Sequence, residues 1–484
     1  MNIAMVYSLK DLTAIVPELI LTGFAFAILL IDLWLPKKMK ALNGLLALFG
    51  VVFSFASVVV MYNSNLTAFN NMIVMDRASN LASVIMLLTA FVAIVMSFDF
   101  LKREDVNLGE YYEVLLFSIV AMQILASTYN LIVMFIAVET LSIGMYILTG
   151  FLRNKDESVE GAMKYFILGS FASTFLVLGI GLFYGLFGSV DLNTIKASLS
   201  SASNFYKYIA ILAFLFVFVG FGFKIASFPF HSWTPDVYAS APTPMSAFMS
   251  IAPKAASFLA LLRFLVVGLG PIEIHWTKVL WIIAVLTMTF GNTVALWQKD
   301  LKRLLGYSSI AHAGYMLVGI TAANELGYGS VMFYLFGYLF MNLGAFAVAE
   351  FISQKEDRGT EIANLKGFGY KYPLIGAAML IFMFCLAGVP PTVGFVGKYY
   401  LFSAAVKAHL YWLAVIGVIN SAISAYFYLG VIVTMYMKDD TEEKIEVFNS
   451  VPVKAVILVM AIAVLYIGIF PSQFLDMALK SIPF

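Results

Sequence analysis

Five ionisable side chains stand inside apolar stretches that are long enough to cross a membrane. They are Glu139, Lys224, Lys254, His312 and Lys398. A charged group at the centre of a membrane helix costs on the order of 2.5–3.5 kcal/mol on insertion scales, so such residues are candidates for function. Burial disfavours the charged form of a lysine, whereas a nearby carboxylate favours it. A lysine balanced in this way can release or take up a proton when its partner moves, so these residues form a candidate proton relay.

The expected partners at one end of this relay are Glu139 and Lys224. Each of the five residues also has a structural interpretation, as part of an internal ion pair or as a side chain that only fixes helix packing. Two further basic residues fit that interpretation better. Lys164 opens its helix beside the charged segment RNKDESVEG, and Arg263 stands near a helix end from which we expect it to reach the lipid headgroups.

A polar stripe is predicted on the helix that carries His312. Ser308, His312 and Tyr315 follow at i, i+4 and i+7, which places them on one face of a helix. Histidine titrates near neutral pH, so His312 could bridge Lys254 and Lys398. The alternative is a hydrogen-bonded packing histidine. The histidines lack the placement of paired haem ligands, and no GxxxxGK[ST] phosphate loop occurs.

Two of the lysines stand beside sequences that interrupt a helix. Pro229 follows Lys224 by five residues, and Pro390 and Pro391 precede Lys398 in a glycine-rich segment. Proline removes a backbone donor and clashes with the preceding turn. Non-helical backbone at membrane depth is tolerated only inside protein or along a water-filled cavity. A break after Lys224 would let it lie deeper in the membrane, although an ordinary proline kink is the simpler alternative.

The composition requires a mostly apolar solvent for these elements. Hydrophobic residues make up 62% of the 484 residues and charged residues only 12%, about half the usual charged share of a soluble domain. The net charge of +1 argues against a nucleic-acid partner. The single cysteine, Cys385, excludes an internal disulfide, an iron–sulfur cluster or a CxxC pair on this chain.

We predict an all-α membrane protein with about fourteen transmembrane helices, because the apolar runs are long and unbroken. The first span lacks a basic n-region with a cleavage site, so we expect it to be retained. The predicted spans lie near residues 12–35, 41–62, 78–98, 111–128, 130–152, 162–187, 205–227, 243–268, 276–297, 303–322, 329–352, 373–407 with its interruption, 411–437 and 453–470.

Basic residues in the loops predict the orientation. The loops after odd-numbered spans hold seventeen Lys and Arg residues, whereas the opposite side, with both termini, holds seven. Loops rich in Lys and Arg stay in the cytoplasm. Both termini are therefore expected on the non-cytoplasmic side.

The two interrupted helices, spans seven and twelve, are five spans apart, so they run in opposite directions through the membrane. Paired interrupted helices in inverted repeats are a recurring transporter architecture. We predict two inverted five-helix repeats, each containing a broken helix. The expected domains are three N-terminal helices at 1–110, a first repeat at 111–268, a second repeat at 276–437 and a C-terminal helix at 453–484.

Four segments make the chain resemble the antiporter-like membrane subunits of respiratory complex I, the proton-pumping NADH:quinone oxidoreductase, and among these the subunit N type. HSWTPDVYASAP is the most specific element, and Lys398 in place of a glutamate also resembles subunit N. The segments cover the middle of the chain, about 110–405. They are GAMKYFILGSFASTFLVLGIGLFYG at 161–185, FKIASFPFHSWTPDVYASAPTPMSAFMSIAPKAASF at 223–258, QKDLKRLLGYSSIAHAGYMLVG at 298–319 and AGVPPTVGFVGKYYLF at 387–402.

The resemblance implies roles for the matching residues. Glu139 corresponds to the family's fifth-helix glutamate, which is thought to modulate the seventh-helix lysine, here Lys224. Lys254 corresponds to the eighth-helix connecting lysine, His312 to the tenth-helix histidine and Lys398 to the twelfth-helix lysine on the exit side.

The resemblance also implies what surrounds the chain. The expected partners are the neighbouring membrane subunits of complex I. This chain is expected to bind no cofactor, because FMN, the iron–sulfur clusters and NADH belong to other subunits. A bacterial inner membrane is the expected location.

Two other functions remain open from the sequence. A subunit of a multisubunit cation/proton antiporter would share the fold but would need no redox partner. A structural scaffold of the membrane arm would hold its neighbours together without conducting protons.

Overall fold

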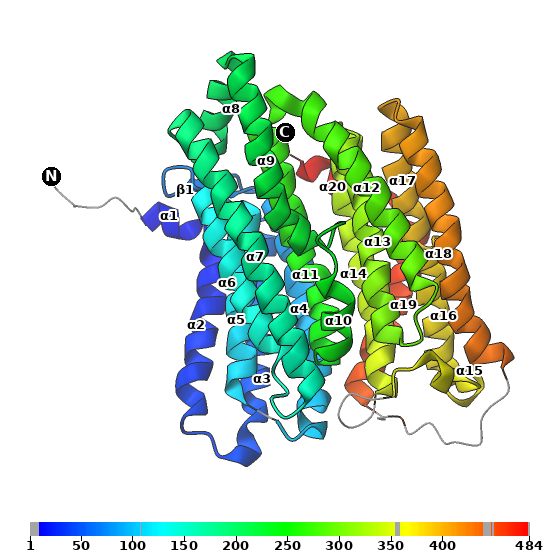
Figure 1. The fold of residues 1–484 in the computed structure, drawn as a ribbon. Helices are drawn as coiled ribbons and strands as arrows, with labels where there is room; N and C mark the ends of the chain where they lie inside the picture. Colours follow the sequence, from blue (N-terminus) through cyan, green and yellow to red (C-terminus); the bar gives the residue numbers. More distant parts are fainter. Residues whose placement is uncertain (1–8, 107, 354–358, 439–446, 448–449, 483–484) are drawn as a thin grey trace.

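The computed structural model describes residues 9–106, 108–353, 359–438, 447 and 450–482, and it is almost entirely helical (Figure 1). The helices are α1 (Leu9–Thr13), α2 (Val16–Asp32), α3 (Ala41–Val60), α4 (Arg77–Arg103), α5 (Gly109–Ser127), α6 (Leu131–Thr149), α7 (Asp156–Phe187), α8 (Leu192–Ser201), α9 (Asn204–Ile225), α10 (Trp233–Ser240), α11 (Thr243–Leu262), α12 (Glu273–Ala295), α13 (Leu301–Thr321), α14 (Glu325–Ile352), α15 (Phe368–Lys371), α16 (Pro373–Ala387), α17 (Val393–Lys407), α18 (Tyr411–Met437), α19 (Val451–Ile469) and α20 (Ser472–Ser481). Short 3-10 turns are η1 (Lys37–Met39), η3 (Gly270–Ile272) and η5 (Ile362–Leu365), and η2 (Arg263–Gly268) is a π-helical turn.

The predicted spans are confirmed as helices. Eleven helical segments within the described residues are long and apolar enough to cross a membrane. The remaining predicted spans are α2, α13 and the interrupted pair of α16 and α17, which stand alongside the others in the bundle (Figure 1). The all-α membrane fold is therefore confirmed.

Several short elements were not predicted. The chain between α3 and α4 forms a small antiparallel hairpin of β1 (Leu66–Ala68) and β2 (Ile73–Met75), in which Leu66 pairs with Met75. The helices α8 and α20 are short and polar on one side, so their hydropathy does not resemble that of a membrane span. Both lie at the same end of the bundle as α1 (Figure 1).

The core of the bundle is built from α11 and α14. About 89% and 94% of their most apolar windows are buried by the rest of the chain, against 33% for α7. Every residue of α11 from Thr243 to Leu262 is buried. A helix that is covered on all sides can carry ionisable groups away from lipid. Lys254 lies on such a helix, α11.

Both interruptions predicted from the prolines are present. The helix α9 ends at Ile225, Ala226 adopts a left-handed conformation with φ +60°, and the chain turns into α10. The helix α16 ends at Ala387, Gly388 has φ +88°, and α17 begins at Val393. The Phe228–Pro229 and Pro390–Pro391 peptide bonds are cis.

The two ends of the chain are consistent with an even number of membrane crossings. The helices α1 and α20 lie at one end of the bundle, and the turns after α2 and α6 lie at the other (Figure 1). Three of the basic residues counted for the cytoplasmic side, Lys355, Arg358 and Lys444, lie outside the described residues.

Candidate functional site

Glu139 lies at the contact between α6 and α7. Its side chain is half-buried and accepts a hydrogen bond from the Ser173 hydroxyl on α7. It forms no ion pair with Lys224, although the two lie within electrostatic range. The expected pair therefore exists as two neighbouring charges and not as a direct contact.

Lys224 stands at the end of α9 inside a cage of aromatic rings. Its ammonium lies 5.6 Å from the ring centroid of Tyr146 and 5.3 Å from those of Tyr165 and Phe223. The side chain is 3% exposed, and Nζ has no hydrogen-bond partner among the described residues. Aromatic faces attract a cation, so the cage can hold the charged form of this lysine without a carboxylate in contact.

The break after α9 closes this cage. Trp233, the first residue of α10, stacks on Tyr165 with a centroid distance of 4.3 Å. Its indole Nε1 donates to the carbonyl oxygen of Phe223 at 3.0 Å, in the last turn of α9. The HSWTPDVY motif therefore positions Lys224 by folding back over the helix end.

Lys254 lies at the centre of α11 and is completely buried. Its ammonium donates to Ser309 on α13, to the carbonyl oxygen at 2.8 Å and also to the hydroxyl. The proline before it, Pro253, stands inside α11. Lys254 therefore faces the second half of the molecule and not the lipid.

His312 lies on α13 between two tyrosine hydroxyls. Nδ1 is 2.6 Å from the Tyr334 hydroxyl on α14, and Nε2 is 3.0 Å from the Tyr428 hydroxyl on α18. The Tyr428 hydroxyl also lies 2.5 Å from the Ser308 hydroxyl, so two members of the predicted stripe meet at one tyrosine. Both ring nitrogens are thus in hydrogen bonds, as proton transfer through an imidazole requires.

Lys398 caps the end of the interrupted helix α16. Its ammonium donates to the carbonyl oxygens of Leu386 at 3.0 Å and Ala387 at 2.9 Å, and to the Ser421 hydroxyl at 2.9 Å. It also lies 4.8 Å from the ring centroid of Tyr315, the third member of the stripe. A positive group beside the free carbonyls of a helix C-terminus is favourably placed.

The residues from Lys254 to Lys398 form one series of neighbours, joined partly by hydrogen bonds and partly by ring contacts. Lys254 reaches Ser309, which is adjacent in sequence to Ser308, and Ser308 reaches His312 through the shared Tyr428. Tyr315 has its ring 5.6 Å from that of His312 and lies against Lys398. His312 is within electrostatic range of both lysines, as a bridging residue must be.

Aromatic contacts lead from the Lys224 cage to α11, the helix that carries Lys254. The Trp233 ring lies 6.1 Å from that of Tyr238, and the Tyr238 hydroxyl donates to the Met249 carbonyl oxygen on α11 at 3.2 Å. Sequence reasoning did not identify Ser309, Tyr334, Tyr428 or Ser421. The chain holds 25 tyrosines, and no local pattern marks the two that reach His312.

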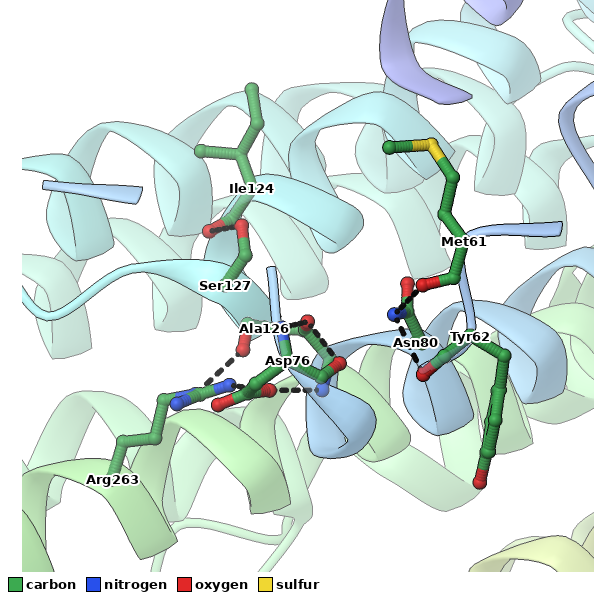
Figure 2. Close-up of polar contacts among 9 residues, drawn as sticks. Met61, Tyr62, Asp76, Asn80, Ile124, Ala126, Ser127 and Arg263 are labelled. Carbon is green, nitrogen blue, oxygen red and sulfur yellow. Dashed lines mark hydrogen bonds and ion pairs between the residues drawn. The ribbon is translucent and has the colours of Figure 1, made fainter. Parts of the chain in front are cut away.

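Arg263 does not reach the lipid headgroups, contrary to the expectation from its position near a helix end. It is fully buried, and Nη2 forms an ion pair with the Asp76 carboxylate at 2.7 Å, while Nε donates to the Ala126 carbonyl oxygen at 2.8 Å (Figure 2). The guanidinium also lies 4.8 Å from the ring centroid of Tyr129. The partners of Arg263 come from the N-terminus of α4 and the end of α5. Hydropathy reports single segments, so it could not predict that these two helix ends cover Arg263.

Lys164 is at the surface, as the sequence indicated. It pairs with Glu160 at 2.7 Å and with Asp236 at 3.2 Å, and Asp236 also pairs with Arg303 at 2.6 Å. Its side chain is 45% exposed, so these pairs are weakly stabilising.

A cavity of about 1010 Å³ opens beside Lys398 between α17 and α18. Most of its lining is apolar, and Ser421 and Lys407 are among its polar residues. Lys398 is therefore covered by fewer protein atoms on this side than Lys254 is in the core.

Comparison with known proteins gives the chain a family context. Residues 128–424 match the family model described as NADH:quinone oxidoreductase/Mrp antiporter, transmembrane. The chain is 42% identical over 482 residues to NADH-quinone oxidoreductase subunit N of Trichlorobacter lovleyi, and the alignment covers 99% of both chains. It is 41% identical over 487 residues to subunit N 1 of Herpetosiphon aurantiacus, with 97% and 98% coverage.

Chains in solved structures have the same fold as this chain. A chain of respiratory complex I from Thermus thermophilus superposes with a TM-score of 0.82 at 33% identity, covering 96% of this chain and 99% of that one. A chain of the Mrp complex from Dietzia has a TM-score of 0.87 at 18% identity, covering 98% and 97%. The second likeness concerns the fold alone.

Proposed function

The chain belongs to the family of NADH-quinone oxidoreductase subunit N, and from this premise we propose that its buried ionisable side chains conduct protons across the membrane. The subunit itself then carries the translocation step, while the oxidation of NADH and the reduction of quinone take place on other subunits. The single cysteine and the position of the lysines inside the bundle both fit such a division of tasks.

The observation that carries this proposal is the set of hydrogen bonds around His312, whose two ring nitrogens meet the Tyr334 and Tyr428 hydroxyls. Proton transfer needs donors and acceptors within about 2.6–3.2 Å of one another, or one water apart. Contacts of this length are present at Lys254, His312 and Lys398. Between them, Tyr315 contacts His312 and Lys398 through its ring. If these positions served only the stability of the fold, apolar side chains of similar volume could fill them without loss of stability.

The residues of the site have distinct tasks in this proposal. Lys254 releases a proton toward Ser309, and His312 passes protons between the Tyr334 and Tyr428 hydroxyls. Lys398 receives the proton at the break and releases it to the non-cytoplasmic side. Glu139 sets the charge state of Lys224, which lies in its field.

The surroundings of the subunit are also part of the proposal. Its partners are the neighbouring membrane subunits of complex I, and FMN and the iron–sulfur clusters are bound by other chains. The location is a bacterial inner membrane, with both chain termini on the non-cytoplasmic side, and protons move from the cytoplasm outward.

Replacing Lys224 with alanine tests conduction against a scaffold role. In purified complex reconstituted into vesicles, the Lys224→Ala variant is expected to lose most NADH-driven proton pumping per assembled complex. The exposed Lys278 on α12 provides the matched control, because Lys278→Ala removes the same group from the surface. Normal pumping by an assembled Lys224→Ala complex would overturn the relay and favour a scaffold.

The antiporter alternative is tested by deleting the gene. For a complex I subunit, the deletion abolishes NADH-driven quinone reduction in membranes and leaves sodium tolerance unchanged. Lost sodium tolerance with intact quinone reduction would instead identify an antiporter subunit. Identity of about 40% to subunit N over the whole chain favours the first result.

A further inference from the structure

We propose that Tyr146 is a further member of the proton path, with its hydroxyl carrying protons between Glu139 and Lys224, and that Gly169 makes the space that holds Tyr146 in place. The proposal rests on the proposed function and extends it to the first half of the molecule. Neither residue stood out in the sequence, because Tyr146 is one of 25 tyrosines and Gly169 one of 34 glycines.

Tyr146 shares a helix face with Glu139. The two residues stand at i and i+7 on α6, with Ser142 between them at i+3, so all three point to the same side. The distance from Glu139 to Tyr146 along the helix is about 10.5 Å at 1.5 Å per residue. Ser142 lies next to the Tyr146 hydroxyl, and the charge of Glu139 acts on that hydroxyl as well as on Lys224. The stripe therefore leads from the half-buried carboxylate toward the caged lysine.

The far end of the stripe reaches Lys224. The Tyr146 ring is one wall of the aromatic cage, 5.6 Å from the ammonium. The Tyr146 hydroxyl and the Lys224 ammonium are both buried, and neither has a hydrogen-bond partner of good geometry among the described residues. Two adjacent buried polar groups in that condition are normally satisfied by water. A water molecule between them would complete a path from Lys224 to Tyr146.

Gly169 fixes the position of the Tyr146 ring. A Cβ built on Gly169, which lies on α7, would stand 2.9 Å from Cζ of Tyr146 and still closer to its hydroxyl oxygen. The same Cβ would lie 3.3 Å from the Phe223 ring, another wall of the cage. The absence of a side chain at this one position lets the tyrosine lie between α6, α7 and α9.

The proposed step moves one proton and leaves Tyr146 unchanged. An N–H bond of the Lys224 ammonium breaks, and its proton passes through water to the Tyr146 oxygen. The O–H proton of Tyr146 passes through water to the Glu139 carboxylate. Lys224 ends neutral and Glu139 ends protonated, so the charge of the pair is conserved. The reverse transfer restores the starting state.

The Tyr146→Phe variant tests the hydroxyl directly, because it keeps the ring of the cage and removes only the oxygen. Vesicles containing the purified variant complex are given NADH, and the pumping rate is divided by the amount of assembled complex. We expect this rate to fall to less than half of the wild-type rate. Tyr184→Phe is the control, because Tyr184 is an exposed tyrosine on α7. It is expected to pump at the wild-type rate.

The Gly169→Ala variant tests the positioning. The added methyl group displaces the Tyr146 hydroxyl, so the pumping rate is again expected to fall by at least half. Gly181→Ala is the control on the same helix, because a Cβ at Gly181 meets no atom within 4 Å. Wild-type pumping by Gly169→Ala would overturn the assignment of Gly169.

Other outcomes separate this inference from the proposed function. Wild-type pumping by Tyr146→Phe, with a loss in Tyr146→Leu, would show that only the ring matters and would overturn the hydroxyl's role. If Lys224→Ala loses pumping while Tyr146→Phe does not, this inference fails and the relay stands. If both variants pump normally, the proposed function fails as well.

Discussion

At the scale of single residues, the buried lysines differ in how their protons are held. Lys254 and Lys398 donate to hydroxyls and carbonyls, whereas Lys224 faces aromatic rings. None of the three forms an ion pair with a carboxylate among the described residues. Oxygen atoms therefore hold the ammonium groups of Lys254 and Lys398, and aromatic faces hold that of Lys224.

Unlike the three lysines, the buried Arg263 forms an ion pair with a carboxylate, that of Asp76. Arginine stays charged, so this pair serves structure. Removing one member of a buried pair typically costs about 3–5 kcal/mol, because the other charge is left uncompensated. Arg263→Met is therefore expected to lower the midpoint of thermal unfolding of the purified complex. The double variant Arg263→Met with Asp76→Asn is expected to recover part of that loss.

The surface pair of Lys164 and Glu160 supplies the comparison, since both side chains are well exposed. Lys164→Met is expected to change the same midpoint little. Equal losses from Arg263→Met and Lys164→Met, or no recovery in the double variant, would contradict a stabilising role for the buried pair.

One local signal could have corrected the interpretation of Arg263. Asp76 caps α4, accepting from the backbone N–H of Ser79, while the Ser79 hydroxyl accepts from the Asp76 N–H. The D-x-x-S spacing just before an apolar run is a helix-start signature. An acidic cap at that end of α4 could have suggested a cationic partner, but only the fold shows that α11 supplies it.

At the scale of elements, α4 holds the two halves of the molecule together. Its first turn is tied through Asp76 to Arg263 after α11. Its last residue, Arg103, pairs with Glu350 on α14 at 3.1 Å. Thus α4 contacts both α11, which carries Lys254, and α14, which carries Tyr334. The helix α4 is therefore packed against the elements that carry the candidate site.

The interruption between α16 and α17 depends on Gly388. Its φ of +88° is unfavourable for residues with a side chain, and a Cβ there would lie 3.0 Å from Cδ and 3.3 Å from Nζ of Lys398. Gly388→Ala is expected to cost about 1 kcal/mol of stability from the backbone alone. It is also expected to displace Lys398 from its two carbonyl partners, so NADH-driven pumping should fall several-fold.

Gly430→Ala is the control for this change. Gly430 lies inside α18, and a Cβ there would meet no atom within 4 Å, so alanine should be neutral or slightly stabilising. Pumping rates and unfolding midpoints of both variants would be measured in the same vesicles. Wild-type pumping by Gly388→Ala would show that the break does not position Lys398.

The elements were predictable to different degrees. Long apolar runs identify α3 or α14 from hydropathy alone, and prolines identify both breaks, because each signal is local. The helix α20 and the β1–β2 hairpin escape such reasoning, since a helix of ten mixed polar and apolar residues or a pair of three-residue strands produces no membrane-length signal. The partners of His312 escape it for another reason, because Tyr428 is 116 residues away in sequence.

At the scale of the whole molecule, the predicted inverted repeats remain a prediction. The two breaks have similar ingredients, each with a residue of positive φ at the helix end and a proline in the connection. Each break also has a lysine close to it. Lys224 lies in the last turn of the helix before its break, and Lys398 lies on the helix after its break. These shared features fit two repeats in opposite orientation. The orientation of the whole chain in the membrane decides which side of the membrane each break faces.

Cysteine labelling can measure that orientation, because the only native cysteine, Cys385, is completely buried and should not react. Ala197 on α8 and Asn154 between α6 and α7 are both exposed, and these two segments lie at opposite ends of the bundle (Figure 1). The charge bias of the loops predicts that Asn154 lies in the cytoplasm and Ala197 outside. For the proposed location in a bacterial inner membrane, the cells are made permeable only at the outer membrane. A maleimide that cannot cross the inner membrane should then label Ala197→Cys and not Asn154→Cys. After the inner membrane is opened, both should react. Labelling of Asn154→Cys alone before opening would invert the orientation and, with it, the proposed direction of proton movement from Lys254 to Lys398.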